Sequence, residues 1–391
     1  MTETASSLRA SLEQLFAEDV ESVRERERSA FDQLAGPWRD SIVLAGAGGL
    51  GRRCLAGLRR HGIEPVAFSD NNPKLWNTSI EGVAVLSPRE AAQRFGKSAI
   101  FVVTIWGAHS PDRMSDRQSA LRSLGCQNVI PFAPLFWKYS QDLLPHYAAD
   151  LPHKVVEQAS DVLRAFDLLA DEQSRCEYVA QVRWRLGGSF DLLPPPERGE
   201  IYFSPEFVKL TPDEVYVDCG AFDGDTLDAF FRASDSTFLS VFAFEPDPAN
   251  YEKLGGFVKT LSGDVQNRIT LARAGVGAKN GRESFTAQGS LASHFGAGGE
   301  LVEVVALDSA LGEQRPTFIK MDIEGAEPEA LLGARRHIQD ASPLLAISCY
   351  HRQDHLWSIP LLIDSLKPGY KFYLRPHDVE GWDLVCYAVS R

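Results

Sequence analysis

The sequence predicts an α/β protein with two doubly wound, largely parallel sheets that a helical segment joins. Two stretches carry this prediction, residues 39–140 and 201–391, because short β-branched apolar runs alternate there with amphipathic helical runs. Between them, residues 141–200 show helical spacing of apolar residues and end in the letters LLPPPERG, whose prolines interrupt helices and strands alike. A chain of 391 residues is long enough for the two or three domains that this division implies.

The composition argues against several classes of protein. The chain carries 53 acidic and 40 basic residues, a formal net charge of −13, which disfavours binding to nucleic-acid backbones and to anionic membrane surfaces. Its six cysteines are scattered without a C-x-x-C pair, which is typical of reduced thiols in a cytoplasmic protein. The N-terminus lacks the pattern of a signal peptide, and no apolar run approaches the roughly 20 residues that span a bilayer. We therefore expect a cytoplasmic protein without nucleic-acid or membrane partners.

Residues 1–38 are predicted to form an N-terminal helical arm that ends at Gly36 and Pro37. Its apolar side chains recur at spacings of three and four residues and form one stripe: Leu8, Leu12, Leu15, Phe16 and Val20. Such a stripe must be buried either against the body of the protein or against a second subunit. We favour the second subunit, and thus a homodimer that this helix holds together.

The first sheet unit opens with a glycine-rich turn between a predicted strand and a predicted helix. Its letters GAGGLG fit the pattern G-x-G-x-x-G, with Gly46, Gly48 and Gly51 at the glycine positions. Such a loop lets the backbone approach a pyrophosphate, while an acid about 20 residues later, here Asp70, holds a ribose. We therefore expect a Rossmann-like domain that binds a nucleotide. The alternative is that the glycines only permit close helix–strand packing.

The second sheet unit opens with a loop that carries more carboxylate, VDCGAFDGDT, and its next strand ends at Glu245. Aspartates beside a ligand loop repel a diphosphate but suit an ammonium or sulfonium cation, and an acid at the second strand tip accepts both ribose hydroxyls. These features describe S-adenosylmethionine better than a nicotinamide dinucleotide. The expected cofactor-binding residues are Asp218, Gly220, Ala221, Phe222, Asp223, Gly224, Thr226, Glu245, Pro246 and Asp247.

Five ordered stretches of this unit resemble the FkbM family of S-adenosylmethionine-dependent methyltransferases: VDCGAFDGDT, AFEPDPANYEKL, AGVG, TFIKMDIEGAEPEALLGA and LLAISCYHRQDHLWSIP. The resemblance covers about Tyr202 to Arg391 and implies a class I methyltransferase fold for residues 201–391. It also implies O-methylation of a hydroxyl on a small-molecule acceptor, because known members mostly methylate hydroxyl oxygens of sugars, polyketides and other natural products. The N-terminal stretches GAGGLG, VAFSDNNP and GVAVLSP are similar to small sugar-modification domains, and this resemblance implies a domain that binds a sugar-nucleotide or no ligand.

Methyl transfer to an alcohol requires a base beside the methyl group, at the end of the fourth strand. The letters there are FIKMDIEG, and strand alternation places Lys320, Asp322 and Glu324 on one face. His351 follows the next apolar run, and a neutral imidazole is the commonest general base near pH 7. We expect His351 or Asp322 to deprotonate the acceptor. The alternatives are an internal Lys320–Glu324 salt bridge and a histidine that only caps or packs.

Three further expectations stay open. A divalent metal, Mg or Mn, is an alternative activator, because carboxylates with an imidazole suit these ions; its ligands would be Asp322, Glu324 and His351. The substrate-binding candidates lie in a glycine-rich loop and at the end of a later strand; they are Ser290, His294, Arg375 and His377. For Arg375 and His377, a solvated hairpin end is the alternative.

The competing function is a nicotinamide-dependent oxidoreductase, or a sugar-nucleotide-binding protein, that acts through GAGGLG.

Overall fold

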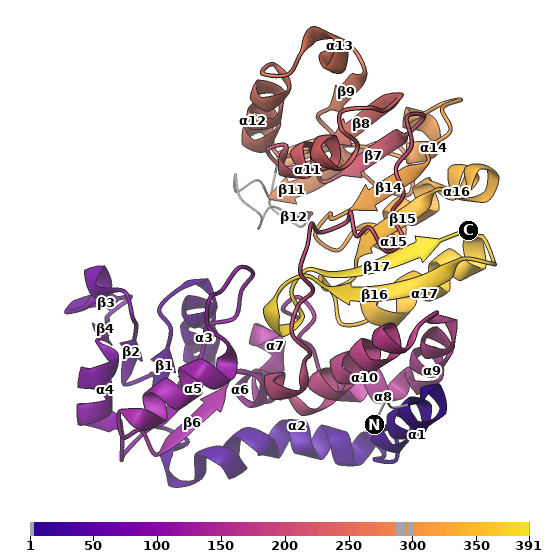
Figure 1. The fold of residues 1–391 in the computed structure, drawn as a ribbon. Helices are drawn as coiled ribbons and strands as arrows, with labels where there is room; N and C mark the ends of the chain where they lie inside the picture. Colours follow the sequence, from indigo (N-terminus) through magenta and orange to yellow (C-terminus); the bar gives the residue numbers. More distant parts are fainter. Residues whose placement is uncertain (1–3, 287–293, 296–299, 391) are drawn as a thin grey trace.

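The computed structural model describes residues 4–286, 294–295 and 300–390 (Figure 1). Its N-terminal unit contains a six-stranded sheet in the order β3-β4-β2-β1-β5-β6, in which every neighbouring pair except β3 with β4 is parallel. The strands are β1 (Ile42–Ala45), β2 (Ala67–Ser69), β3 (Thr78–Ile80), β4 (Val83–Leu86), β5 (Ile100–Val103) and β6 (Asn128–Pro131). Because β1 lies between β2 and β5, the strand order reverses there, at the position where open α/β sheets bind ligands.

The helices of this unit follow the strands as the alternating sequence pattern predicts. The longest begins directly after the glycine loop, where Gly48 is the N-cap residue, and the next is capped by Ser87, whose side chain accepts from the Glu90 N–H. The helices are α3 (Gly49–Arg60), α4 (Pro88–Phe95), α5 (Met114–Ser123), α6 (Ala133–Lys138) and α7 (Ser140–Leu143).

The C-terminal unit is built on a seven-stranded sheet in the order β16-β17-β15-β14-β7-β8-β9. Its strands are parallel except β17, which runs antiparallel to both of its neighbours. The strands are β7 (Val215–Cys219), β8 (Ser240–Phe244), β9 (Ile269–Ala272), β14 (Phe318–Met321), β15 (Leu344–Ser348), β16 (Lys371–Pro376) and β17 (Leu384–Val389). Here too the order reverses at the first strand, because β7 lies between β8 and β14.

Seven helices and a small sheet complete the described part of this unit. The small sheet has the order β10-β13-β11-β12 and comprises β10 (Gly275–Val276), β11 (Gly281–Thr286), β12 (His294–Phe295) and β13 (Glu300–Val305). The helices are α11 (Asp225–Ala233), α12 (Pro248–Val258), α13 (Gly263–Gln266), α14 (Leu307–Ala310), α15 (Glu327–Gly333), α16 (Arg335–Ala341) and α17 (His355–Leu366).

The helical segment between the units packs against the C-terminal sheet. Its helices are α8 (Pro152–Glu157), α9 (Ala159–Leu168) and α10 (Glu172–Gly187). After α9 the backbone joins the edge strand β16, because the Ala170 N–H donates to the Phe372 carbonyl at 2.8 Å. One apolar core runs from the N-terminal sheet through α9 and α10 to one face of the C-terminal sheet, and a second core covers the other face.

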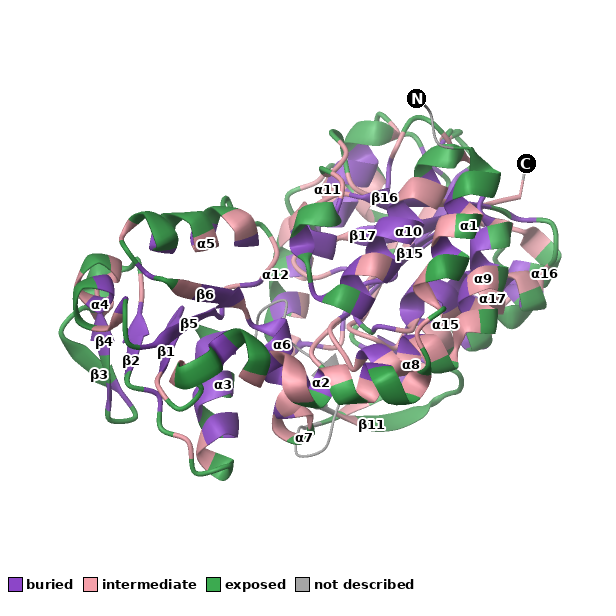
Figure 2. Cartoon of the chain, turned by 90° about the horizontal axis from the view of Figure 1, so that it is seen from below, coloured by how far each residue is buried: buried purple, intermediate pink, exposed green. Residues whose placement is uncertain are grey.

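The N-terminal arm differs from its prediction in two ways. It consists of two helices, α1 (Ala5–Leu15) and α2 (Val20–Ala35), and Asp19 caps the second one. Its stripe is covered by the chain itself, since Leu8 and Leu12 are buried and α1 packs against α9 and α10 (Figure 1). Seen from below, α2 runs along the junction of the two units (Figure 2). Part of the stripe is therefore covered within the chain itself, and the dimer expected at this arm stays a prediction.

The predicted fold class, two doubly wound α/β sheets with a connecting helical segment, is confirmed. Within the part of the chain that the structure describes, no helix has both the length and the apolar character needed to cross a membrane. Five of the cysteines are buried thiols outside any disulfide: Cys54, Cys126, Cys219, Cys349 and Cys386.

Candidate active site

The glycine loop of the C-terminal unit connects β7 to α11. Gly220 has φ +82°, and a Cβ on it would lie 2.0 Å from the Asp322 carbonyl oxygen, so only glycine fits there. The Gly220 N–H donates to the Phe244 carbonyl at 3.0 Å. Gly224, at φ +101°, then turns the chain into the helix. The loop is thus locked against the ends of two neighbouring strands, β8 and β14.

The loop is held from behind by a buried ion pair. The Lys320 Nζ lies 3.1 Å from the Asp218 Oδ1 and donates to the Gly220 carbonyl at 2.7 Å. Burial raises the pKa of Asp218 to about 6, although Lys320 opposes this shift. Lys320 therefore does not form the salt bridge with Glu324 that was the alternative to a catalytic role. Asp218 does not line the cavity, and its contact with Lys320 supports the loop from within the protein.

Glu245, at the end of β8, lies beside the same loop. Its Oε2 accepts from the Phe222 N–H at 3.0 Å, and its Oε1 accepts from the Asp247 N–H at 2.8 Å. Burial raises the pKa of Glu245 to about 7, although these two amides lower it. A carboxylate has about four lone-pair positions, so the oxygens can still accept from a ligand. Asp247 instead caps α12, because its side chain accepts from the Ala249 and Asn250 amides.

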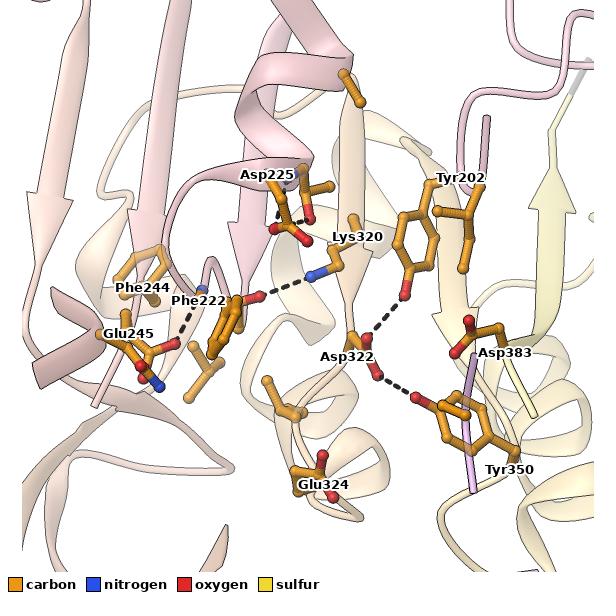
Figure 3. A pocket seen from close by; sticks show the side chains of 18 of the residues that line it. Tyr202, Phe222, Asp225, Phe244, Glu245, Lys320, Asp322, Glu324, Tyr350 and Asp383 are labelled. Atoms are coloured by element: carbon orange, nitrogen blue, oxygen red, sulfur yellow. Dashed lines mark hydrogen bonds between the residues drawn. The ribbon is translucent and has the colours of Figure 1, made fainter. Parts of the chain in front are cut away.

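Asp322 follows β14 directly, and its carboxylate is held by two tyrosines (Figure 3). The Tyr202 hydroxyl donates to Oδ2 at 2.8 Å, and the Tyr350 hydroxyl donates to Oδ1 at 3.4 Å. The Nε2 of His351 lies 3.3 Å from Oδ1, while 26% of the Asp322 side chain stays exposed. The carboxylate is therefore fixed in position with room to accept a further hydrogen bond from the cavity.

His351 lies behind Asp322 and does not line the cavity. Its Nδ1 is 2.8 Å from the Oε1 of Glu327, whose other oxygen faces His355 at 3.3 Å. Burial alone would lower the pKa of His351, but Glu327, Glu324 and Asp322 raise it to about 10. The imidazole is therefore protonated at neutral pH and cannot accept another proton. The geometry therefore favours a histidine cation that pairs with Asp322 over the neutral histidine base that the sequence predicted.

The proposed metal ligands form an ion-pair cluster. Glu324 stands in a turn with φ +55°, and its Oε1 lies 3.9 Å from the Nε2 of His351. Ligand atoms of Asp322, Glu327 and His351 lie within 4.8 Å of one another. A metal requires a deprotonated imidazole nitrogen, however, and Glu327 already faces two histidines. These residues fit a protonated histidine better than they fit Mg or Mn.

A cavity of about 510 Å³ opens in front of the glycine loop and Asp322 (Figure 3), and we call it the main cavity. A volume of this size is typical of small-molecule sites. Both units contribute to its wall. The C-terminal unit supplies most of the polar and aromatic lining: Tyr202, Gly220, Phe222, Asp225, Thr226, Glu245, Pro246, Lys320, Asp322, Glu324, Tyr350, Trp382 and Asp383. The N-terminal part of the chain supplies Ala108, His109 and Tyr147.

The segment that reaches over from the N-terminal unit is the connection between β5 and α5, residues 104–113. The ring of Trp106 packs 4.9 Å from that of Trp382, centroid to centroid, and its N–H donates to the Glu380 carbonyl at 3.2 Å. Buried Arg117 lies 3.5 Å from the Glu380 carboxylate. These buried contacts fix residues 104–113 at the edge of the main cavity.

Several predicted residues lie away from the main cavity. Arg375 is fully buried, and its guanidinium pairs with Asp171, Glu197 and Glu206, so it joins the helical segment to the sheet and is not positioned to bind substrate. The Nε2 of His377 lies 2.8 Å from the Tyr387 hydroxyl. Ala221, Asp223 and Gly224 shape the loop but do not line the cavity. Ser290 lies outside the described residues, as does the side chain of His294, whose backbone is in β12.

Sequence reasoning missed many of the residues that line the main cavity, and five with polar side chains show why. Tyr202 and Tyr350 carried a weak signal, because the first opens the resembling stretch and the second precedes His351. No sequence motif marked His109, Tyr147 and Asp383 as cavity residues, because each reaches the cavity only through the packing of segments that are distant in sequence. Of the residues predicted to be catalytic, Lys320, Asp322 and Glu324 line the cavity.

The glycines of the N-terminal loop have mainly packing roles. Gly46 has φ +125°, and a Cβ on it would lie 2.9 Å from the Thr104 carbonyl oxygen. A Cβ on Gly51 would lie 1.9 Å from the Gly46 carbonyl oxygen, whereas one on Gly48 would meet nothing within 4 Å. Asp70 accepts from the Ala47 N–H at 2.8 Å, so one amide of the loop is already bound. Nothing in this geometry favours a nicotinamide dinucleotide.

Known proteins resemble this chain in its C-terminal unit and in its whole fold. Residues 218–372 match the family model of the methyltransferase FkbM domain. The solved structure of the methyltransferase FkbM from Methylobacillus flagellatus KT superposes on 98% of this chain, and the match includes 98% of that protein's own chain. The TM-score is 0.78 and the sequence identity is 24%. The S-adenosylhomocysteine-bound methyltransferase PaMTH1 from Podospora anserina matches 59% of this chain over 88% of its own length. Its TM-score is 0.28 and its sequence identity is 11%. No curated protein matches significantly. Residues 218–372 of the C-terminal unit therefore match a methyltransferase FkbM domain, and the chain as a whole shares the fold of the solved FkbM methyltransferase.

Proposed function

We propose that the protein is an O-methyltransferase that moves a methyl group from S-adenosylmethionine to a hydroxyl oxygen of a small molecule, such as a sugar or another natural product. The observation that carries this proposal is the carboxylate of Asp322. It faces the main cavity across from the glycine loop and Glu245, and Tyr202 and His351 hold it in one orientation. Methyl transfer to a hydroxyl needs a base that is held within hydrogen-bond reach of the reacting proton.

The residues around the glycine loop fit the cofactor. Glu245 would accept the two ribose hydroxyls with its remaining lone pairs, and Phe222 and Pro246 would flank the adenosine. Asp225 adds a carboxylate to the lining, which suits a molecule with ammonium and sulfonium charges. When bound, S-adenosylmethionine supplies a methyl group on a sulfonium, which is already a good leaving group.

The chain's own contribution to the reaction is made at Asp322. The acceptor hydroxyl donates a hydrogen bond to the carboxylate, and its proton passes to Asp322 as the oxygen forms a bond to the methyl carbon and the carbon–sulfur bond breaks. Tyr202 and the protonated His351 keep the carboxylate directed at that proton. His351 is thus a positioning residue in this proposal, and Asp322 is the base.

The acceptor would lie between the two units. The lining on that side combines aromatic rings, Tyr147, Tyr350 and Trp382, with the carboxyl groups of Glu324 and Asp383. Burial raises the pKa of Glu324 to about 7 and that of Asp383 to about 6. Rings that contact the face of an acceptor and carboxyls that bind its hydroxyls together suit a hydroxylated ring.

The test is methyl transfer itself. The purified chain is incubated with S-adenosylmethionine labelled with ¹³C at the methyl group and with a panel of hydroxylated glycosides and phenols. We expect the label on an oxygen of at least one acceptor, with S-adenosylhomocysteine released in equal amount. Label that appears only on nitrogen or carbon would contradict O-methylation, and failure to bind S-adenosylhomocysteine would contradict the proposal as a whole.

A further inference from the structure

The N-terminal unit has a cavity of its own, of about 360 Å³, which we call the second cavity. Its floor is formed by Ala45, Ser69 and Val103, the last residues of β1, β2 and β5. It therefore lies at the carboxyl edge of the sheet, where the strand order reverses. The proposed methyl transfer makes no use of this cavity.

A buried hydroxyl group in the second cavity lacks a partner. Ser69 is 3% exposed and lines the cavity, yet its Oγ has no hydrogen-bond partner in the described structure. Buried polar groups are almost always hydrogen-bonded, and each exception calls for an explanation. A ligand atom that donates to or accepts from this hydroxyl supplies one.

The charges around the second cavity disfavour an anionic ligand. Asp112 and Asp116 are exposed at its mouth. The one cationic side chain among its lining residues is Arg117, which donates to the Ile105 carbonyl at 3.2 Å and pairs with Glu380. A phosphate here would meet two carboxylates and no uncommitted cation. The pyrophosphate that the glycine motif predicts is therefore the wrong chemistry for this cavity.

The remaining lining suits an uncharged ring that carries hydroxyl groups. Val103, Ile105 and Leu121 offer apolar walls for a flat heterocycle, while Ser69 is placed to bond one of its heteroatoms. The carboxylates at the mouth can accept from ribose hydroxyls, as charged acceptors do strongly. We propose that the second cavity binds an uncharged nucleoside. The segment 104–113 lines both cavities, through Ile105 and Asp112 here and through His109 at the main cavity.

The experiment is calorimetric titration of the full chain with adenosine, with uridine and with adenosine 5′-monophosphate. S-adenosylhomocysteine is present in excess to occupy the main cavity. We expect at least one nucleoside to bind with one site per chain, and the monophosphate to bind about tenfold more weakly than adenosine or worse, because of the carboxylates. The proposal is overturned if neither nucleoside binds or if the monophosphate binds as well as adenosine.

Two variants locate the binding. Ala120→Phe fills the second cavity from α5 and should abolish nucleoside binding, while Ser119→Phe, at an exposed neighbouring position that does not line it, should leave binding unchanged. Equal thermal midpoints show that both variants fold. Nucleoside binding that persists in Ala120→Phe contradicts the proposal. If S-adenosylhomocysteine itself fails to bind, the proposed methyl transfer fails, and the contrast between the two variants still decides whether this cavity takes a nucleoside.

Discussion

The two sheet units build their glycine loops in the same way. Gly46 follows β1 and Gly220 follows β7. A Cβ on Gly46 would collide with the Thr104 carbonyl oxygen, after the neighbouring strand β5, and a Cβ on Gly220 would collide with the Asp322 carbonyl oxygen, after the neighbouring strand β14. Each glycine N–H donates to the last carbonyl of the strand on the other side, at 2.8 Å and 3.0 Å. The backbone that surrounds a ligand site is thus present twice in one chain.

The acid at the second strand tip repeats as well. Asp70 accepts from the Ala47 N–H at 2.8 Å, and Glu245 accepts from the Phe222 N–H at 3.0 Å. In both units the acid therefore binds its own loop first. A ribose-binding acid and a loop-closing acid consequently look alike in sequence.

The difference lies in the residue that follows the neighbouring strand. After β5 stands Thr104, whose hydroxyl donates to the Gly46 carbonyl at 2.9 Å and is buried. After β14 stands Asp322, whose carboxylate opens into the main cavity. The backbone determines where a site can form, and the side chain at the strand end determines which chemistry it can support.

The largest effect is expected at the two strand ends. Asp322→Asn keeps the shape but removes the base, so turnover should fall by about 10²–10⁴-fold while S-adenosylhomocysteine affinity stays within a few-fold. Thr104→Val is the matched change in the other unit and should leave turnover unchanged. Single-turnover kinetics with each purified variant measures this. Full activity of Asp322→Asn would show that the base lies elsewhere.

The next largest difference is expected between the acids at the second strand tips, Glu245 and Asp70, in their effect on cofactor affinity. Glu245→Ala removes the acceptor for two ribose hydroxyls, a loss of about 1.5–3 kcal/mol, so S-adenosylhomocysteine should bind about tenfold more weakly or worse. Asp70→Ala should leave that affinity unchanged. Titration calorimetry on folded variants measures both. Equal losses in the two variants would mean that the units do not divide their roles as described.

Cofactor affinity should also depend on pH through Glu245. Because burial raises the pKa of this carboxyl to about 7 and hydroxyl donors favour its ionised form, affinity should rise as the pH rises to about 7 and level off above it. Glu245→Gln cannot ionise and should flatten the profile. Calorimetry at several pH values checks this, and an unchanged slope in the glutamine variant would assign the titration to another group.

A smaller effect is expected for the residues that the N-terminal part of the chain adds to the main cavity. His109→Ala and Tyr147→Phe each remove one polar group from the cavity wall on the proposed acceptor side, so the KM of the acceptor should rise about 2–10-fold while cofactor affinity is unchanged. His61→Ala is the control, because His61 pairs with Asp142 away from the cavity. A KM that changes as much in the control would remove the N-terminal unit from acceptor binding.

No effect is expected from metal removal. The pKa of His351 is raised to about 10, so its imidazole is protonated and a poor ligand at neutral pH. Turnover should therefore be the same after dialysis against a chelator and after addition of Mg or Mn. Activity that the chelator abolishes and the metal restores would reinstate Asp322, Glu324 and His351 as a metal site.

Much of the fold and part of the site could be predicted from sequence because they depend on local patterns. Apolar runs that end in glycines or acids marked the strand tips, and Asp322 and Glu245 do line the main cavity. Arg375 was predicted to bind substrate, and its structural role could not be predicted because its partner Asp171 lies some 200 positions earlier in the chain. The protonation of His351 depends on burial and on Glu327, which only the packed structure brings together.

The most direct test of this account is a crystal structure of the chain with bound S-adenosylhomocysteine. We expect the ribose hydroxyls on Glu245 and the sulfur atom directed across the main cavity at Asp322, with nothing bound along the Gly46 loop. Adenosine density at Asp70, or a sulfur atom that points away from Asp322, would contradict the assignment of methyl transfer to the C-terminal unit.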